Sequence, residues 1–462
     1  MPSIDWHTMQ WWVYLALLVA VAWFLGARLA RRSRRKAVLI GGPLPRGEPS
    51  ESFDDEESPR AADTAEGPVE PAAGLGSAAP PRGDEHHGDE LAAEWPTAST
   101  PREATTDRAP PPISPRIGSA PPIETVPPDP GLPVLPVGAA LVPVYFATSR
   151  RSTASTRPEE RYGPERGELS YGRADVSIPP GHRPGRLESP LRVFSFRLSP
   201  DPARHVMLQR VVEYPTVAVW RLAMAEALGQ ASSPDVFVFI HGYNTSFADA
   251  IRRTAQLGTD LDFQGVKFAY AWPSRATEAA YPADESTSAW VERDLTTVLQ
   301  ELAALPGLRA LHVVAHSMGS RPLMETLKTF ADRGEPPSIG ELILAAPDLD
   351  APYFHDVLAP AVRRQAARVS LYASARDRAL EASVKFHRVQ RAGWSLPTPV
   401  VALGVDTIDA SLVDTSWLGH GYFADTKQVI DDLFMLLRHR LEPPERNLRP
   451  VAIPAGTYWR LP

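Results

Sequence analysis

The sequence contains no cysteine, and its basic residues do not outnumber its acidic ones. The absence of cysteine excludes disulfide frameworks, cysteine-ligated zinc, thiolate catalysis and a lipid anchor on cysteine, but it fits either redox compartment. Lys and Arg total 48 against 55 Asp and Glu, which gives a formal net charge of −7. Because a nucleic-acid binder needs a basic face, this balance argues against a DNA or RNA partner.

Composition divides the 462 residues into three parts. We predict an N-terminal membrane anchor with a basic flank at residues 1–36, a Pro/Ala-rich linker at 37–140 and a catalytic domain at 141–462. The chain holds 49 prolines, many of them in the linker, where aromatic residues are almost absent. Such a segment buries too little apolar surface to offset its ordering entropy, so we expect it to be disordered.

The anchor is predicted at residues 9–27, which carry no formal charge and are long enough to cross the roughly 30 Å hydrocarbon core of a bilayer. Trp and Tyr lie near both ends, and an Arg-rich stretch follows at 28–36. A cleaved signal peptide would carry its positive charges before the apolar run. The positive-inside rule places the catalytic domain on the cytoplasmic face, with a periplasmic or extracytoplasmic placement as the alternative.

Apolar strands alternate with amphipathic helices in the third part of the chain. This order is typical of an α/β fold with a mostly parallel central sheet and helices on both faces. The first three strands are expected to pair as antiparallel edge strands. Strands are predicted at 141–148, 168–178, 206–212, 236–240, 266–272, 310–315, 342–346 and 369–373. Helices are predicted at 216–228, 248–257, from about 286, at 321–330, within 353–367 and at 426–440.

The catalytic residues of such a sheet lie just after its strands, where the loops converge. The strand at 310–315 is followed by Ala315-His-Ser-Met-Gly319, a nucleophile elbow with alanine at the first small position. A serine on this tight turn exposes its hydroxyl, and the next backbone N–H, that of Met318, points to the developing oxyanion. We therefore predict Ser317 as a nucleophile; the alternative is a serine that only caps the following helix.

A serine nucleophile needs a base, and histidine has a suitable pKa. His387, His420 and His439 follow the last strand predicted above, and only His420 lies in a glycine-flanked loop just before the final helix. The chain order Ser, acid, His makes His420 the predicted base. The predicted acid is Asp377, and Asp348 is the alternative acid, although we expect Asp348 to cap the helix that follows it.

The second oxyanion donor is expected in the loop after the strand at 236–240. The backbone N–H of Tyr243 is the first candidate and that of Asn244 the second. Each such donor contributes about 10²–10³ in rate. His241 is expected to hold the turn rather than to act in catalysis.

Several short motifs occur in a fixed order along the domain. They are Val144-Tyr-Phe-Ala-Thr148, Leu169-Ser-Tyr-Gly172, His241-Gly-Tyr-Asn, Tyr270-Ala-Trp-Pro-Ser274, Ala315-His-Ser-Met-Gly319, Ala346-Pro-Asp348, Tyr372-Ala-Ser374 with Asp377, and Tyr458-Trp459. Together they resemble the bacterial α/β hydrolase family called domain of unknown function nine hundred. The resemblance implies the α/β-hydrolase fold, a triad of Ser317, Asp377 and His420, and no metal or organic cofactor. Tyr281 and Asp284 also match the family and are interpreted as loop and helix-start residues.

The sequence thus predicts a membrane-anchored serine hydrolase, most consistent with an esterase or lipase acting on a small-molecule or lipid ester. The alternatives are an acyltransferase that uses the same triad and a non-catalytic binding module with the same fold. No protein partner is identified.

Overall fold

A computed structural model describes residues 131, 134–190, 192–193, 196–197, 200–277, 280–335, 339–413 and 422–462. The predicted anchor and nearly all of the predicted linker lie outside these ranges, as does His420. Within them, no helix is both long and apolar enough to cross a bilayer.

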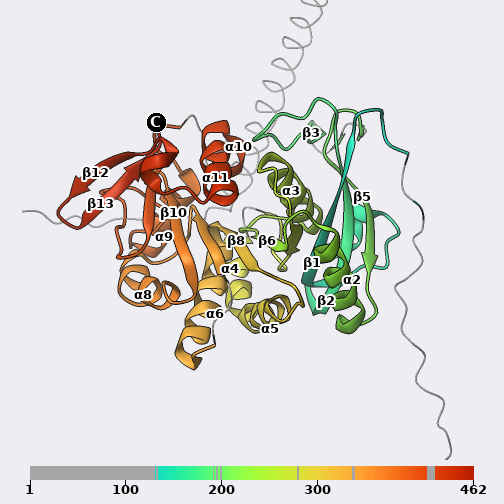
Figure 1. Ribbon diagram of the computed structural model, residues 1–462, viewed down its shortest axis with the longest axis horizontal. Helices are drawn as coiled ribbons and strands as arrows, with labels where there is room; N and C mark the ends of the chain where they lie inside the picture. The colour runs from blue at the N-terminus through green and yellow to red at the C-terminus, as the bar shows by residue number, and fades with distance from the viewer. Residues whose placement is uncertain are drawn as a thin grey trace, which may run out of the picture. The chain divides into compact units, whose positions relative to one another are not determined.

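The described residues form an 11-stranded sheet whose order is β12-β13-β11-β10-β9-β8-β6-β7-β1-β2-β5 (Figure 1). The strands from β13 to β1 run parallel, and β12, β2 and β5 are antiparallel to their neighbours at the two ends. The bounds are β1 (Ala140–Ser152), β2 (Tyr162–Ile178), β5 (Met207–Glu213), β6 (Asp235–Ile240), β7 (Val266–Tyr270), β8 (Ala310–His316), β9 (Ile339–Ala345), β10 (Ala366–Ala373), β11 (Asp406–Asp409), β12 (Arg449–Ile453) and β13 (Gly456–Arg460). The two short strands β3 (Arg192–Val193) and β4 (Phe196–Arg197) pair separately.

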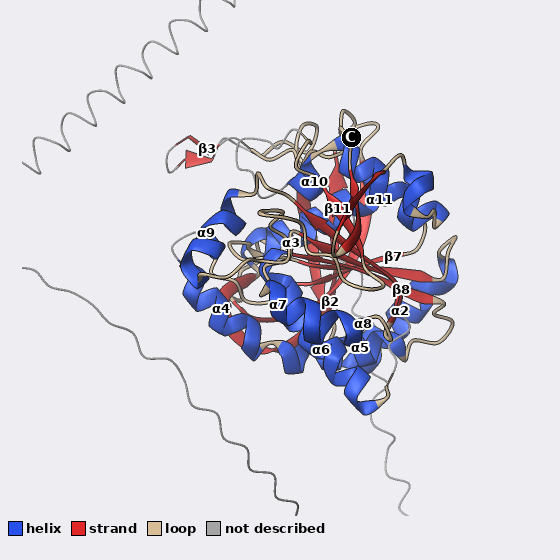
Figure 2. Ribbon diagram, turned by 90° about the vertical axis from the view of Figure 1, so that its left-hand side faces the viewer, coloured by secondary structure: helices blue, strands red, loops and turns tan. Residues whose placement is uncertain are grey.

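Helices cover both faces of this sheet because its central strands are apolar on both sides. In β6, Val236, Val238 and Ile240 join the hydrophobic cluster under α2, α5, α6 and α8, whereas Phe237 and Phe239 join the cluster under α11 and the end of α3. Figure 2 shows α10 and α11 on one side of the sheet and α5, α6 and α8 on the other. The bounds are α2 (Val217–Gln230), α3 (Phe247–Asp260), α4 (Tyr281–Trp290), α5 (Glu292–Ala303), α6 (Ser320–Arg333), α7 (Ala351–Tyr353), α8 (Ala359–Val362), α9 (Arg378–His387), α10 (Tyr422–Asp425) and α11 (Lys427–His439).

The predicted mostly parallel sheet is confirmed, and so is the antiparallel pairing of the first three strands, β1 with β2 and β2 with β5. Three strands after β10 were not predicted. β11 is a four-residue strand with Asp at both ends, and β12 and β13 form a short hairpin at the sheet edge. The helix predicted from about 286 is two helices, α4 and α5, which meet at Val291.

A buried ionic cluster joins the strand that precedes Asp377 to the final helix. On β10, the Tyr372 hydroxyl donates to the Asp432 carboxylate of α11 at 2.5 Å. Arg446 lies 3.1 Å from the same carboxylate oxygen, and all three side chains are fully buried. Burial raises the pKa of Asp432, while Arg446 opposes that rise. The cluster therefore fixes α11 against β10, and α11 follows His420 in the chain.

Candidate active site

Ser317 occupies a sharp turn between β8 and α6. Its φ of +52° lies in the left-handed region, which costs an L-residue other than glycine about 1–2 kcal/mol. A helix-capping residue has extended dihedrals instead, as Ser246 does at the start of α3, where its φ is −79° and its ψ is 166°. The structure therefore contradicts the alternative that Ser317 serves only as a helix cap.

Close backbone contacts hold this turn. A Cβ atom on Gly319 would lie 2.2 Å from the carbonyl oxygen of His241, so only glycine fits there. A Cβ atom on Gly242 would lie 2.8 Å from the Cβ of Ser317. The loop after β6 and the turn after β8 are thus in direct contact, which brings the two segments with predicted oxyanion donors together.

Asp377 lies at the start of α9, four residues after β10, and its side chain is fully buried. Its Oδ1 atom accepts the backbone N–H groups of Ala379 and Leu380, each at 3.0 Å. These two hydrogen bonds fix the carboxylate. Because β8 and β10 both run parallel to β9, Asp377 and Ser317 both follow strands at the same end of the sheet, the carboxyl end. As a catalytic acid, Asp377 stays a prediction.

The predicted base, His420, lies outside the described residues. Of the other two late histidines, His387 on α9 contacts Glu285 through Nε2 at 2.9 Å and the Ser383 carbonyl through Nδ1 at 3.0 Å. His439 is exposed at the end of α11, where its ring packs on Phe434. Both ring nitrogens of His387 have partners within the fold, and His420 remains our prediction for the base.

The two predicted oxyanion donors lie on the contacting segments. Met318 is buried in the first turn after β8, where backbone N–H groups have no partner within the helix. The backbone N–H of Asn244 donates to Asp284 at 3.2 Å. This bond makes Asn244 unsuitable as the second donor and leaves Tyr243, which stays a prediction.

His241 is a structural residue, as predicted. Its ring stacks on Trp272 at 5.0 Å between centroids, and its carbonyl accepts the Trp272 indole N–H at 2.7 Å. Burial, together with the charge of Arg150, lowers the pKa of His241 to about 3. The ring is therefore neutral at neutral pH, where it donates to either the Gly242 or the Trp272 carbonyl and is a weak proton acceptor.

Tyr281 and Asp284 lie in the first turn of α4, as predicted for helix-start residues. Asp284 is fully buried and accepts hydrogen bonds from the loops after β6 and β7. The donors are the Asn244 and Arg275 backbone N–H groups and the Ser274 hydroxyl. Asp284 thus joins α4 to the loop that carries Tyr243.

Asp348 does not cap a helix, contrary to our prediction; Asp350 does, by accepting the Tyr353 N–H. The Asp348 backbone N–H instead donates to the Ser317 carbonyl at 3.2 Å, and both carboxylate oxygens are occupied. Oδ1 accepts from Ser383 and Arg391, and Oδ2 accepts from Tyr281 and Arg321.

Asp348 is 2% exposed. Burial alone would raise the pKa of its carboxyl, but Arg321 and Arg391 with the Ser383 and Tyr281 hydroxyls hold it at about 2. The group is thus a permanent anion that links α6, which follows Ser317, to α9, which follows Asp377.

Arg150 was not identified from the sequence as a functional residue. It lies just after the strand predicted at 141–148, in the kind of position where functional residues were expected. It is buried, and its guanidinium donates to the Thr245 carbonyl at 2.7 Å and the Ser274 carbonyl at 3.1 Å. Burial lowers the pKa of Arg150 to about 9, a value still above neutral pH, so the guanidinium stays charged. Arg150 thus braces the loops after β6 and β7.

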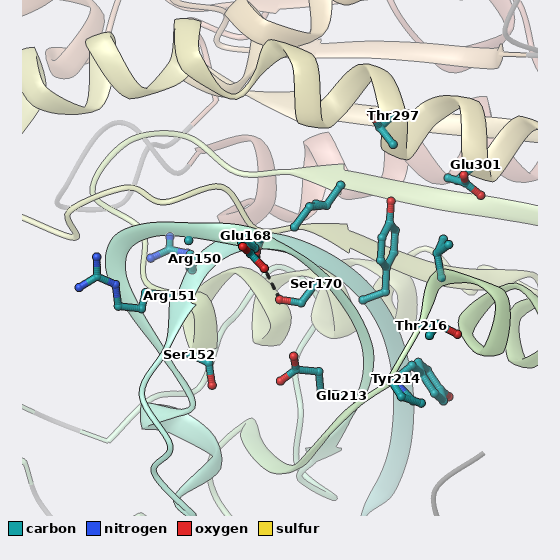
Figure 3. A pocket seen from close by; sticks show the side chains of 15 residues that line it. Arg150, Arg151, Ser152, Glu168, Ser170, Glu213, Tyr214, Thr216, Thr297 and Glu301 are labelled. Atoms are coloured by element: carbon teal, nitrogen blue, oxygen red, sulfur yellow. Dashed lines mark hydrogen bonds between the residues drawn. The ribbon is translucent and has the colours of Figure 1, made fainter. Parts of the chain in front are cut away.

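The other side of Arg150 borders a hollow of about 710 Å³ between β1, β2, β5 and the helices α2 and α5 (Figure 3). Glu168, Glu213 and Glu301 line it, and Ser317 does not. Within the described ranges, no group of three or more His, Asp or Glu side chains is arranged to hold a metal ion.

Residues 220–440 match the family described as alpha/beta hydrolase of unknown function (DUF900), the family that the motifs resemble. The matched stretch contains Tyr243, Ser317, Met318, Asp377 and His420. The resemblance is confirmed for this stretch, and the described sheet is that of an α/β hydrolase. No curated protein matches the sequence significantly.

Solved structures similar to this chain include hydrolases of low identity. A predicted CIB-like hydrolase from Thermoplasma acidophilum is 12% identical, with 45% of this chain and 88% of that chain covered and a TM-score of 0.26. A structure of the metagenome-derived lipolytic enzymes LipS and LipT is 11% identical, with 44% and 93% covered and a TM-score of 0.28. A fungal esterase from Rhizomucor miehei is 12% identical, with 65% and 84% covered and a TM-score of 0.27.

The strained backbone of Ser317 predicts that Ser317→Gly is more stable than the wild-type protein by about 1 kcal/mol, because glycine adopts positive φ freely. Ser317→Ala, which keeps the strain, should show no such gain. As a control, Ser286→Gly on the exposed side of α4 should lose stability by roughly 0.5 kcal/mol. Urea unfolding measures all three, and a Ser317→Gly protein less stable than Ser317→Ala would contradict the account.

The depressed pKa of Asp348 predicts a loss of stability in acid. A folded-state pKa of about 2, against the ordinary 3.8, stabilises the fold above about pH 4 by roughly 2 kcal/mol, and this contribution disappears as the pH falls through 2. Asp348→Asn should therefore remove that part of the slope, whereas Asp356→Asn, at an exposed site on the segment between α7 and α8, should keep it. Denaturant unfolding between pH 5 and 2 tests this, and equal slopes for wild type and Asp348→Asn would refute the assignment.

Proposed function

We propose that this protein is a membrane-tethered serine hydrolase that cleaves carboxylic esters through an acyl-enzyme intermediate on Ser317. The left-handed backbone of Ser317 at the carboxyl end of β8 carries the proposal. Strain of this kind persists only where the surrounding structure enforces it, and a serine on a tight strand-to-helix turn is the nucleophile of this hydrolase fold. Ser317 itself is 2% exposed, contrary to the exposed hydroxyl that the motif predicts. The match of residues 220–440 to a hydrolase family supports the same conclusion.

In the first half of the reaction, the Ser317 hydroxyl attacks the ester carbonyl carbon and His420 takes its proton. The Met318 and Tyr243 backbone N–H groups bind the oxyanion, each contributing about 10²–10³ in rate. The intermediate then collapses: the carbon–oxygen bond to the alcohol breaks, and His420 returns the proton to the leaving oxygen. Asp377 orients the imidazole and stabilises its charged form.

In the second half, water attacks the acyl-enzyme carbonyl while His420 accepts its proton. The bond to Ser317 breaks, the proton returns to the serine oxygen, and the carboxylic acid leaves. No metal or organic cofactor takes part in these steps. The substrate proposed is a small-molecule or lipid ester.

The tether in the proposal is the apolar stretch at residues 9–27, followed by the linker at 37–140. The Arg-rich residues after the apolar stretch favour a cytoplasmic catalytic domain. As a flexible coil, a linker of about 100 residues spans roughly 55 Å. Such a tether would let the domain reach substrates within or near the bilayer.

Hydrolysis of p-nitrophenyl butyrate by the full chain tests the proposal. Ser317→Ala and His420→Ala should each lower kcat by about 10⁴ or more, and Asp377→Asn should lower it more than Asp348→Asn. The matched controls are Ser286→Ala and His439→Ala, which remove an exposed serine and an exposed histidine. Unchanged turnover in Ser317→Ala would overturn the proposal, and no turnover by folded wild-type protein would favour a binding module.

A further inference from the structure

Helix α9 presents a basic face to the outside of the domain. Its inner side packs through Leu380 and Ser383, which are buried. The residues on the opposite side are exposed, or partly exposed in the case of Glu381, and they recur three or four positions apart, so they share one face of the helix. They are Arg378, Glu381, Ala382, Lys385 and Phe386. In Figure 2, α9 lies at the margin of the described residues.

Positive charge dominates this outward face. Between residues 376 and 388, four basic side chains are exposed: Arg376, Arg378, Lys385 and Arg388. The two acids in the same stretch are Asp377, which is buried, and Glu381, which lies 2.6 Å from Lys385. The chain as a whole carries a formal net charge of −7. The outward face of α9 therefore differs in sign from the protein as a whole.

Apolar side chains lie on this face and beside it. Phe386 is 62% exposed and Leu412 is 63% exposed. The Ser411 hydroxyl accepts the Ala375 backbone N–H at 2.8 Å, and Leu412 and Arg376 each follow one partner of this contact. A single exposed apolar residue needs no explanation. Exposed apolar side chains among basic ones, however, are typical of helices that bind membrane surfaces.

Helix α9 is attached directly to the proposed site. Asp377, the predicted acid, is the N-cap of α9 and accepts the backbone N–H groups of Ala379 and Leu380. The strand before α9, β10, and the strand before Ser317, β8, both run parallel to β9. Helix α9 therefore begins at the carboxyl end of the sheet, as the turn of Ser317 does. A surface that binds α9 would lie close to the proposed acid.

Two features favour an anionic bilayer as the partner of this face. The first is charge, since the cytoplasmic leaflet carries anionic lipids and each basic side chain near its surface favours binding by about fivefold. The second is the pairing of group types, because Phe386 and Leu412 can insert at the acyl boundary while the basic side chains contact headgroups. The apolar stretch at residues 9–27, with its Arg-rich flank, is proposed above to hold the chain at that leaflet.

We propose that the outward face of α9, with Leu412 beside it, docks the catalytic domain on an anionic bilayer surface, with the helix that Asp377 caps against the headgroups. This inference rests on the proposed tether and goes further. A flexible linker of about 100 residues alone would let the domain present any side to the bilayer, whereas docking selects one. Of the two ester classes proposed above, docking favours the lipid ester, because it keeps the site at the bilayer surface.

The test places a fluorophore on this face. Because the sequence has no cysteine, Phe386→Cys gives the full chain one attachment point for NBD, whose emission moves to shorter wavelength in an apolar environment. The labelled full chain is reconstituted into vesicles of phosphatidylcholine, either alone or mixed with phosphatidylglycerol. We expect the emission to move to shorter wavelength only with phosphatidylglycerol, and high salt should reverse the change.

Two matched controls accompany this measurement. The control for position is Leu222→Cys on α2, where the leucine is 66% exposed; its emission should be equal in the two kinds of vesicle. In labelled Phe386→Cys, the combined changes Arg378→Gln, Lys385→Gln and Arg388→Gln should weaken docking about a hundredfold and abolish the shift. The control for charge replaces three exposed arginines at the ends of α6 and α8 and should keep the shift: Arg333→Gln, Arg363→Gln and Arg364→Gln.

The outcomes separate the docking from the tether. Equal emission of Phe386→Cys in the two kinds of vesicle, from a chain that sediments with both, would overturn the docking and leave the tether standing. A full chain that sediments with neither would overturn both. If the emission lies at short wavelength in both kinds of vesicle and returns to long wavelength when the acids at 54–57 are replaced by their amides, that acidic run covers the face and the inference is wrong.

Discussion

The contact between the loop after β6 and the turn after β8 is the constraint on which the site depends. The Cα of Gly319 lies against the His241 carbonyl so closely that no side chain fits, and Gly242 lies against Ser317 in the same way. Because neither backbone can relax, Ser317 is kept at a positive φ that serine would otherwise avoid. The same contact brings the segments of Tyr243 and Met318 together, so one packing constraint accounts for the backbone of the proposed nucleophile and the placement of the proposed oxyanion donors.

Buried charges hold the segments around this contact. Arg150 ties the loops after β6 and β7 through their carbonyls, and Asp284 ties the same loops through their N–H groups and Ser274. Asp348 joins the Ser317 carbonyl to α9 through its own N–H and its carboxylate. Removing one partner from a buried ion pair leaves an uncompensated charge, which costs about 3–5 kcal/mol. These contacts therefore hold the loops around Ser317 against one another.

The central fold could be predicted from the sequence because β6, β8 and β9 each contain a run of apolar residues that is buried on both faces. β11 and the β12–β13 hairpin could not be predicted, because they are short and carry polar residues or proline. Only their pairing makes them strands: β11 pairs with β10, and β13 pairs with β11. The elbow motif predicted the tight turn at Ser317, because its signal is local, while the role of Ser317 as nucleophile stays a prediction. The prediction that Asp348 caps a helix was wrong because its partners Arg321, Arg391 and Tyr281 are distant in sequence. No local pattern distinguishes a capping aspartate from a buried one.

Covalent labelling of the full chain with a fluorophosphonate probe, followed by peptide mapping, tests the central claim most directly. The account predicts a single modified residue, Ser317, with labelling slowed by a competing ester and lost in Ser317→Ala. His420→Ala should label far more slowly, because the hydroxyl then lacks its base. Absence of label from folded wild-type protein, or label on another serine, would contradict the account.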